Sequence, residues 1–570
     1  MHQMRPLLLC LALLVTACTT PSPQASSGTN QQPGRSATSS AKRVVVAIMG
    51  EPTTLSQKLN SAGAGSIPGA DAAEQLVSAG LSLVDGSGTL RPQLAESVPS
   101  IENGLWTVSP DGRMQTTWRT RSGAQWHDGT PFTSADLMFT ARVAQDRDLA
   151  AFRDIAFDSI DSIEAPDART IVVQWRRPFI DADTLFTTVR AIPLPEHLLG
   201  AAYSTAKDTF TEVPYWSQDF VGTGPFKLRQ WVQGSYMITD ANEQYALGRP
   251  KLDTIEVRFI SDANTLATSV LAGGVQLTMG RNLSLETAIQ TRDRWPDGKL
   301  DVGLKSWIAL FPQFLNPSPA ALGDVRLRRA LLHGTDRQEL ANSLQAGLTP
   351  VADNLLAPGS PEYAAVERNI VRYAYDPRRA SQLMSELGYQ AGSDGMLHDA
   401  SGQRVSIEIR TIAGDDIIEK MTFAVANDWQ RLGLGVEPLP IPIQRVRDRE
   451  WRSIFPGFEL LRQPNDPAAV TRGHSSETPL PENNFTGVNR SRYRNADWDG
   501  LLDTYVATIP RAERMDVLGQ IVHHMTDQLV WMGLFYNVEA TMVANRLANA
   551  GSNNTGSSTQ AWNAAEWDLR

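Results

Sequence analysis

Hydrophobic and polar positions along the chain follow two different periods. Short apolar runs, some alternating with polar residues, are typical of β-strands, whereas apolar residues spaced three or four positions apart indicate α-helices. The two kinds of segment are interleaved along the chain, and this favours an α/β or α+β architecture. Strands are predicted at 44–49, 114–118, 170–175, 254–259, 405–410 and 529–536, and helices at 134–144, 324–334, 376–388, 416–433 and 511–529.

The stretch QWHDGTPFTSADLMFT, residues 125–140, combines several local signals. Asp128 and the glycine after it form a tight-turn pair, because glycine tolerates a positive φ. Thr133 and Asp136 have the spacing of a capping box, in which the threonine caps a helix and the acid reaches back to it. His127 beside Asp128 suggests an acid–base pair, but neighbours in sequence rarely face each other productively. We therefore predict a strand, a turn and a capped helix here, and no catalytic site.

The length and charge of the chain limit its architecture and partners. A chain of 570 residues exceeds a single hydrophobic core, since cores stop growing at roughly 250–300 residues, and two or three domains are expected. The net charge is −10, and the sequence has no dense run of Lys and Arg. A nucleic-acid partner is therefore not expected.

The first residues, MHQMRPLLLCLALLVTAC, are typical of an export signal. Arg5 precedes an apolar run from Leu7 to Val15 that is too short to span a bilayer as a mature helix. The ending VTAC resembles a bacterial lipoprotein box. We expect residues 1–17 to be a signal peptide and Cys18 to carry a lipid. The alternative is an ordinary signal peptide in which Cys18 is only a small apolar residue.

The residues after this signal predict a flexible tether. Residues 18–41 have no periodicity and almost no large apolar side chain, so we expect a lipidated N-terminus followed by a flexible linker. Cleavage before Cys18 would leave one cysteine and no internal disulfide. No second apolar span of about 18 residues follows. The protein is therefore expected to be lipid-anchored at the outer face of the cytoplasmic membrane, in a periplasm or at the cell surface.

The capped-helix segment also carries a family resemblance. Residues 116–140 resemble the signature of bacterial extracellular solute-binding proteins of family 5, the peptide/nickel-type substrate-binding lipoproteins of ABC importers. That family has a strand, then W-x-D-G-x-P-x-T-A-x-D-V, then a helix. The matching residues are Trp126, Asp128, Gly129, Pro131, Thr133 and Asp136. Six further segments resemble the family in the same order, at 80–98, 160–178, 193–199, 221–231, 324–340 and 375–389.

The resemblance implies a fold and a function. The expected fold is α/β, two-lobed and periplasmic-binding-protein-like (type II, cluster C), with an extra α+β domain inserted in lobe one. It implies a monomer that captures a peptide or small solute by hinge closure and delivers it to ABC importer permease subunits, with no cofactor and no catalytic residue. Mapped onto this chain, lobe one is 42–76, 217–304 and 530–570, the extension domain is 77–216, and lobe two is 305–529.

The family's usual ligands are peptides, although it also takes nickel complexes, oligosaccharides and opines. Its peptide binders hold the ligand's amino terminus with an Asp in a G-W-x-x-D pattern after a strand of lobe two. The corresponding region here is FELLRQPNDP, with Arg462 and Gln463 near the expected positions and Asp466 offset. An arginine there suits a carboxylate or a polyol, because a guanidinium donates in a fixed fork. The alternative is a surface arginine paired with Glu459.

Three further residues are candidates for ligand binding. Glu51 follows the first strand, where loop ends usually line such clefts. Trp307 follows the expected crossover into lobe two and suits either an aromatic ligand wall or the core. Asn484 in ENNFTG matches a family asparagine near the cleft, or is simply a loop asparagine.

Motifs of enzymes and metal sites are missing or incomplete. The sequence has no H-E-x-x-H, C-x-x-C or G-x-x-x-x-G-K-[ST]. GHSSE (473–477) lacks the last glycine of a serine elbow, and Gly222 and Gly224 have no third glycine after them. His523 and His524 are about 100° apart on a helix, so we expect no shared metal. The alternatives left open are a surface sensor of the same fold without transport, and an exported hydrolase.

Overall fold

The computed structural model of the protein describes residues 41–60, 67–110, 112–188, 190–445 and 448–570. The expected signal peptide, the expected lipid site Cys18 and nearly all of the expected linker lie outside this part. Within the described residues, no helix is both long and apolar enough to pass through a membrane.

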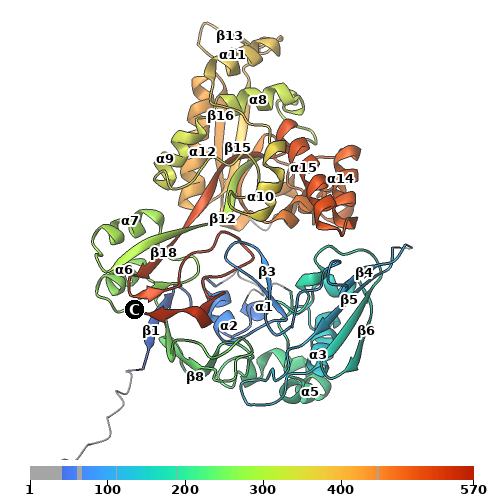
Figure 1. The fold of residues 1–570 in the computed structure, drawn as a ribbon. Coiled ribbons are helices and arrows are strands. Elements are labelled where there is room, and N and C mark those ends of the chain that lie inside the picture. Colours follow the sequence, from blue (N-terminus) through green and yellow to red (C-terminus); the bar gives the residue numbers. More distant parts are fainter. Residues whose placement is uncertain (1–40, 61–66, 111, 189, 446–447) are drawn as a thin grey trace, which may run out of the picture. The chain divides into compact units, whose positions relative to one another are not determined.

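Ten strands form one mixed sheet in the order β16-β15-β17-β12-β18-β11-β1-β10-β9-β8 (Figure 1). They are β1 (Arg43–Ile48), β8 (Phe226–Val232), β9 (Tyr236–Ala241), β10 (Thr254–Phe259), β11 (Leu277–Thr278), β12 (Gly298–Pro312), β15 (Ser406–Ile412), β16 (Gly435–Ile441), β17 (Phe458–Pro464) and β18 (Met532–Ala544). The first strand lies between two parallel neighbours, β10 and β11. Its residues Val44, Val46 and Ile48 are fully buried. A strand with parallel neighbours is covered on both faces, which explains its nearly continuous apolar sequence.

Two long strands, β12 and β18, connect the two ends of this sheet. They pair antiparallel from Gly298↔Ala544 to Leu310↔Met532. At one end β18 also pairs with β11, and at the other end β12 also pairs with β17. Between these ends the sheet is only two strands wide, and Lys305 is an extra residue in β12 at a register shift. We call this two-stranded segment the ribbon.

The ribbon joins two halves, which we define by sequence. The second half is residues 306–531, from the part of β12 that pairs with β17 to the residue before β18. The first half is the rest of the described chain. In the second half a core cluster packs β15 and β17 against α8 (Val325–His333), α9 (Arg337–Gln345), α11 (Pro377–Glu386) and α12 (Asp416–Arg431). The apolar face of α12 supplies Ile418, Met421 and Trp429 to this cluster.

The first half contains a second, smaller sheet. Its order is β4-β5-β7-β6, with β4 (Trp106–Val108), β5 (Met114–Arg119), β6 (Ile160–Asp167) and β7 (Thr170–Trp175). Met114, Thr116 and Trp118 of β5 are buried and alternate with more exposed residues, as the period of two predicts. Helices α3 (Ser134–Gln145) and α5 (Glu196–Thr205) accompany this sheet. It lies within the residues that we expected to form the extension domain.

The turn and helix predicted after β5 are present. Gly129 has a φ of 91°, and the capping box of α3 is confirmed, with the Thr133 N–H donating to Asp136 Oδ2 at 2.9 Å. His127 and Asp128 do not pair with each other. The His127 ring contacts Gly222 and Gly224, whereas Asp128 Oδ2 lies 2.8 Å from Nε2 of His197.

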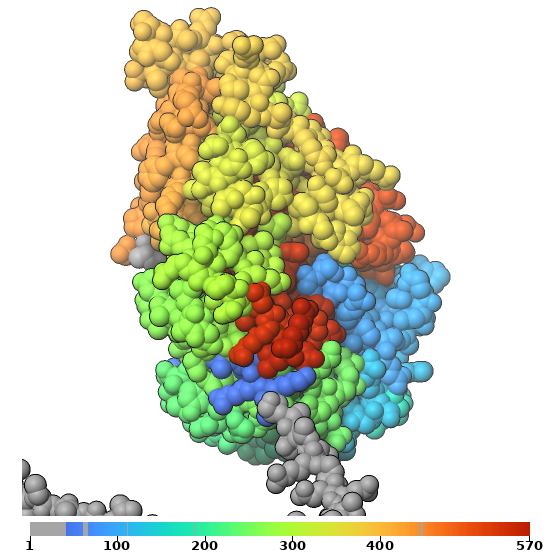
Figure 2. All heavy atoms as spheres, turned by 60° about the vertical axis from the view of Figure 1, so that its left-hand side comes forward, coloured from blue at the N-terminus to red at the C-terminus, as the bar shows by residue number. Residues whose placement is uncertain are grey.

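The C-terminal residues return to the first strand. Lys42 Nζ donates to Asp568 Oδ1 at 2.6 Å, and Trp567 belongs to the same core cluster as Val44 and Val543. In Figure 2 the C-terminal residues (dark red) lie at the surface next to β1 (dark blue). The first half therefore needs both ends of the described chain.

The remaining elements are short or lie outside the two main sheets. The boundary that we expected between residues 304 and 305 lies inside β12, and the one at 529/530 lies just before β18. The other helices and strands are α1 (Gln57–Asn60), α2 (Ala70–Val77), α4 (Ile155–Asp158), α6 (Ala263–Leu271), α7 (Leu285–Asp293), α10 (Pro361–Val366), α13 (Arg449–Ser453), α14 (Ala496–Ala507), α15 (Arg511–Asp527), β2 (Ser82–Val84), β3 (Leu90–Pro92), β13 (Gln390–Ala391), β14 (Leu397–His398), β19 (Leu547–Ala548) and β20 (Asp568–Leu569).

Candidate functional site

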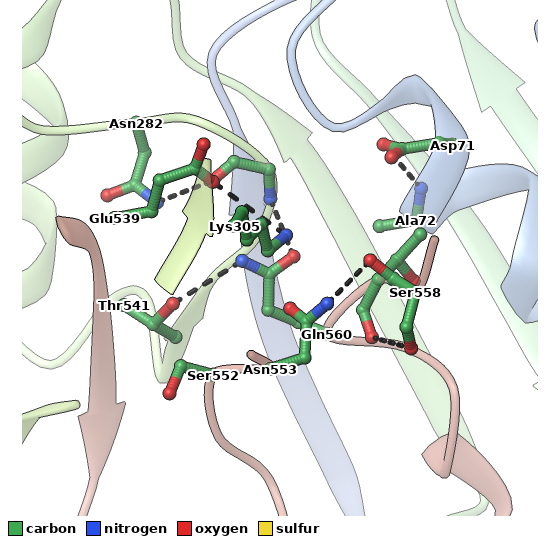
Figure 3. A network of polar contacts seen from close by, with 12 residues as sticks. Asp71, Ala72, Asn282, Lys305, Glu539, Thr541, Ser552, Asn553, Ser558 and Gln560 are labelled. Atoms are coloured by element: carbon green, nitrogen blue, oxygen red, sulfur yellow. Dashed lines mark hydrogen bonds and ion pairs between the residues drawn. The ribbon is translucent and has the colours of Figure 1, made fainter. Parts of the chain in front are cut away.

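Two ion pairs, one from each half, lie at or near the ribbon. Arg462 of β17 forms an ion pair with Asp415, with 2.9 Å between Nη2 and Oδ2. The charges of Arg281, which follows β11, and of Glu539 in β18 also act on Arg462. Lys305 Nζ lies 3.8 Å from Glu539 Oε2, and Figure 3 shows these two side chains pointing toward each other.

Beside Lys305 and Glu539, amide and hydroxyl groups of the first half form a network of hydrogen bonds (Figure 3). Gln560 accepts from the Gly280 N–H at 3.1 Å and donates to Thr541 at 3.4 Å. The Asn282 amide donates to the carbonyls of Gly280 and Ala540. Because these amide groups have partners within the protein, they are held in one arrangement.

The second half holds a cavity of about 320 Å³, which we call the arginine cavity. Trp307, Phe311 and Trp531 form an aromatic wall, with ring centroids 6.4 Å apart for Trp307–Trp531 and 5.7 Å apart for Phe311–Trp531. The full lining is Trp307, Phe311, Leu355, Ile412, Arg452, Leu461, Arg462, Gln463, Ala469, Arg472, Val488, Arg490 and Trp531.

The polar part of the lining is dominated by four arginines and contains no carboxylate. Arg452 and Arg490 both bind the deeply buried Glu459, each through a different carboxylate oxygen. Arg472 donates to the Gln463 side-chain oxygen at 2.8 Å, and Arg462 pairs with Asp415 as described above. Three guanidinium groups therefore share two carboxylates and the fourth has a neutral partner, so the positive charges of the lining outnumber their paired carboxylates.

Two of these arginines have donors without partners. The Nε atoms of Arg452 and Arg462 are buried and have no hydrogen-bond partner among the described residues. Burial lowers the pKa of Arg462, and Asp415 opposes this effect. A buried donor without an acceptor costs about 1–3 kcal/mol, so such groups need an explanation.

A second hollow of about 350 Å³ adjoins the arginine cavity. The two share Arg472 and Val488 in their linings. Val488 is 46% exposed. Arg177, which follows β7 of the small sheet, lines the far part of this hollow. The space beside β17 therefore extends from the second half toward the first half.

The structure brings two of the four predicted ligand-binding residues together. Trp307 and Arg462 lie on paired strands, one register position apart, and both line the arginine cavity. Trp307 is only 1% exposed, so it is at once a core residue and a cavity wall. The alternative partner for Arg462 is wrong, because Glu459 is occupied by Arg452 and Arg490.

The other two predicted residues lie elsewhere. Glu51 Oε1 accepts the Gly234 N–H at 2.7 Å, at the turn between β8 and β9. Asn484 is exposed, with a φ of 51°, at the end of a short 3-10 helix. The offset Asp466 accepts the Ala468 N–H through one oxygen and the Ser557 hydroxyl, at 2.7 Å, through the other.

The sequence analysis did not identify Phe311, Arg452, Arg490 or Trp531 as cavity residues. Phe311 lies in β12 and Arg452 in α13. Arg490 lies in a segment without helix or strand, and Trp531 directly precedes β18. No local spacing connects these segments. A long apolar run that contains a tryptophan just before β18 was the single signal available.

The histidine pair and the glycines of the incomplete motifs have structural roles. His524 Nε2 contacts the Tyr493 hydroxyl at 3.0 Å, while His523 Nδ1 contacts the Asn369 carbonyl at 3.3 Å, so the two imidazoles face different groups. A Cβ on Gly222 would lie 2.0 Å from the Val77 carbonyl oxygen, so this glycine is required for close packing. The described residues contain no group of three or more His, Cys, Asp or Glu side chains suited to a metal ion.

Comparisons with known proteins agree with this architecture. A sequence profile of the bacterial extracellular solute-binding proteins, family 5 Middle, matches residues 89–491. A putative ABC transporter peptide-binding protein of Brucella ovis is 26% identical over 456 residues, which cover 77% of this chain and 79% of that protein. The oligopeptide-binding protein AppA of Bacillus subtilis is 24% identical over 550 residues, covering 94% of this chain and 92% of AppA.

Solved structures extend the likeness to the fold. AppA of Bacillus subtilis in complex with a nonapeptide superposes with a TM-score of 0.66 at 21% identity, over 93% of this chain and 99% of AppA. NikA from Brucella suis in complex with Fe(III)-EDTA gives 0.72 at 20% identity, over 93% and 100%. These structures confirm the expected α/β, two-lobed, periplasmic-binding-protein-like fold. Because the family profile covers most of the chain, the protein belongs to the bacterial extracellular solute-binding proteins of family 5.

Proposed function

We propose that the protein captures a peptide or a similar small polar solute outside the cytoplasm and delivers it to the permease subunits of an ABC importer. The family membership and the names of the relatives from Brucella ovis and Bacillus subtilis support this proposal. The observation that carries it is the arginine cavity, which lies where β12 and β17 pair, next to the ribbon.

Capture would work through bending of the ribbon. A two-stranded segment with a bulge at Lys305 is the narrowest part of the ten-stranded sheet. A ligand that contacts both halves stabilises the conformation in which they are close together, because it has more contacts there than in the separated one. The importer would then recognise the ligand-bound conformation, and the ligand would be released unchanged.

The proposal is tested by thermal unfolding and small-angle scattering with a pool of short peptides. A ligand present at 100 times its dissociation constant should add about 2.7 kcal/mol to the free energy of unfolding. The radius of gyration should fall in the same samples, and mass spectrometry should recover the ligand intact. Stabilisation without a change in the scattering curve would contradict hinge closure, and cleavage of the peptides would contradict the binding function.

The lipid anchor at Cys18 belongs to the same proposal. One acyl chain holds a protein to a membrane only weakly, whereas two or more chains anchor it stably. Cells expressing the chain and fed a radiolabelled fatty acid should label the wild type and leave Cys18→Ser unlabelled. Equal labelling of both would exclude this residue as the lipid site.

A further inference from the structure

We propose that the arginine cavity binds a carboxylate of the ligand together with the apolar group next to it. The ligand would then be an anion, or a peptide presenting a C-terminal or side-chain carboxylate at this point. This inference rests on the proposed function and names the ligand chemistry of the same cleft.

The charge balance of the cavity favours an anion. Its lining includes Arg452, Arg462, Arg472 and Arg490 and no acidic residue. Glu459 and Asp415, the carboxylates that pair with these arginines, are not among the described lining residues. Because three of the guanidinium groups share two carboxylates and Arg472 has a neutral partner, an additional anion reduces the repulsion among them.

The existing carboxylates are already paired with guanidinium groups, so they offer a ligand's ammonium group no net negative charge. Glu459 uses one oxygen for Arg452 and the other, at 2.9 Å, for Arg490. Asp415 accepts Arg462 with both oxygens, at 3.1 and 2.9 Å, and also caps α12 through the Ile418 N–H. A free amino group in this cavity would face guanidinium groups without a counter-charge.

The donors that lack partners are of the kind that carboxylates satisfy. Arg452 and Arg462 line the cavity, and the Nε of each is buried without a partner in the described part of the chain. A guanidinium presents its donors in a planar fork that matches the two oxygens of a carboxylate. An oxyanion bound in the cavity would be an acceptor for the guanidinium groups that line it.

The walls and the size restrict what accompanies the carboxylate. Trp307, Phe311 and Trp531 form one wall, and Leu355, Ile412 and Leu461 add aliphatic surface. A volume of about 320 Å³ lies at the low end of ligand pockets, which span about 300–1,000 Å³. The cavity therefore suits one residue-sized group with an apolar body, and the adjoining hollow that shares Arg472 and Val488 can take the rest of a longer ligand.

Isothermal titration with cavity-sized probes tests the inference directly. Phenylpropionate supplies a carboxylate and an aromatic body, phenylpropanol removes the charge, phenethylammonium reverses it, and phenyl phosphate replaces the carboxylate by another oxyanion. We expect phenylpropionate to bind about tenfold more tightly than phenylpropanol, which corresponds to about 1.4 kcal/mol. We expect no measurable heat from phenethylammonium and weaker binding of phenyl phosphate. Binding of the ammonium probe as tight as that of the carboxylate would overturn the inference.

A pair of acetylated amino acids separates the two sources of the carboxylate. N-acetylphenylalanine carries it at the α position next to the aromatic group, whereas N-acetylglutamate amide carries it only on the side chain. Tighter binding of the first assigns the cavity to a C-terminal carboxylate, and tighter binding of the second assigns it to an acidic side chain. Equal binding of N-acetylphenylalanine and its amide would contradict the assignment to a C-terminal carboxylate.

Variants locate the binding to the arginines. Arg462→Gln should weaken phenylpropionate binding about tenfold, and Arg462→Lys should recover part of this loss by keeping the charge without the fork. Arg472 is exposed, so Arg472→Gln serves if Arg462→Gln does not fold, and it should cost about threefold because its contact is less desolvated. The matched control is Arg329→Gln. The Arg329 Nε is also buried without a described partner, and the side chain pairs with Asp527 at 2.7 Å, but Arg329 does not line the cavity.

The outcomes distinguish the failure of this inference from the failure of the proposed function. If short peptides stabilise the protein while the carboxylate and neutral probes bind equally, the cavity assignment fails and the proposed function remains. If Arg329→Gln weakens the probe as much as Arg462→Gln does, the effect is not located in the cavity. If neither peptides nor probes bind, both proposals fail.

Discussion

Two groups of ionisable side chains in this molecule differ in how completely the protein satisfies them. The first is the turn and capped helix at residues 126–136 in the first half, and the second is the arginine cavity in the second half. The Nε2 of His127 lies 3.1 Å from the Gly224 carbonyl, and its Nδ1 accepts the Gly222 N–H at 3.2 Å. In the cavity, buried Nε atoms of Arg452 and Arg462 have no partner among the described residues.

This difference separates side chains that stabilise the fold from side chains that are available to bind a ligand. Asp136 accepts N–H groups from Thr133 and from Glu196, so it joins the start of α3 to the start of α5. The ionisable side chains of this region, His127, Asp128 and Asp136, all have partners within the protein, so they stabilise the fold. A cluster with desolvated donors left over costs stability unless something binds to it. Substitutions in the two regions should therefore affect different measurements.

The largest expected effect on stability is at the glycine that His127 contacts. In Gly222→Ala the new Cβ would lie 2.0 Å from the Val77 carbonyl oxygen, which is backbone and cannot turn away. We expect a loss of about 3 kcal/mol in the free energy of unfolding, measured by urea denaturation. The control is Gly200→Ala in α5, where the nearest atom is the flexible Glu196 Cγ at 3.4 Å. This control should be neutral or slightly stabilising, because alanine favours a helix.

The next effect depends on pH and concerns His127. Burial lowers its pKa from 6.5 to about 4. Between these values the unfolded chain binds the proton and the folded protein does not, so stability falls as the pH falls through this range, by at most about 1.4 kcal/mol per pH unit. Urea denaturation at several pH values should show that stability increases more steeply with pH, or decreases less steeply, in the wild type than in His127→Gln.

The wild-type slope has a second contribution with the opposite sign. Burial raises the pKa of Glu74 from 4.5 to about 8, so its contribution to stability is lost as the pH rises between those values. The comparison of wild type with His127→Gln cancels this effect, because both proteins contain Glu74. Identical slopes in the two proteins would show that the His127 imidazole is not the group that titrates.

Loss of the capping acid should have a moderate effect. In Asp136→Ala the N–H groups of Thr133 and Glu196 lose their acceptor. We expect unfolding to become easier by about 1–2 kcal/mol, and binding of phenylpropionate to stay unchanged. A large change in binding would mean that this region and the cavity are energetically coupled, and the separation drawn above would be incorrect.

The smallest effect on stability is expected in the cavity itself. Arg472→Gln removes an exposed charge whose one described hydrogen bond is to the Gln463 side chain. Its free energy of unfolding should stay within about 0.5 kcal/mol of the wild type, while binding of phenylpropionate weakens. A variant that lost stability and kept its affinity would reverse the assignment of the two regions.

Local sequence rules predicted the elements whose causes are local. The capping box follows from the spacing of Thr133 and Asp136, and α12 follows from apolar residues spaced three and four apart. The long strand β12 was missed because its first half is only partly buried and its second half is almost fully buried, so that no single period describes it. The extent of such a strand is set by its neighbours β18 and β17.

The candidate site was predictable only in part, for a related reason. Trp307 and Arg462 were found through a family resemblance and the strand on which Arg462 lies. Arg490 is held at the cavity by its hydrogen bond to Glu459, which lies 31 positions away in sequence. Contacts of this kind follow from strand pairing over long distances, which composition and periodicity do not encode.

The order of strands in the large sheet also affects how the sheet forms while the chain is being synthesised. β11 and β12 are consecutive in sequence, yet β18 lies between them in the sheet. Until residues 532–544 have been made, β11 and the first part of β12 both present free backbone N–H and C=O groups, and such open edges promote aggregation. The last long strand closes both edges at once. A chain that ends before it should therefore precipitate even though most of its residues are present.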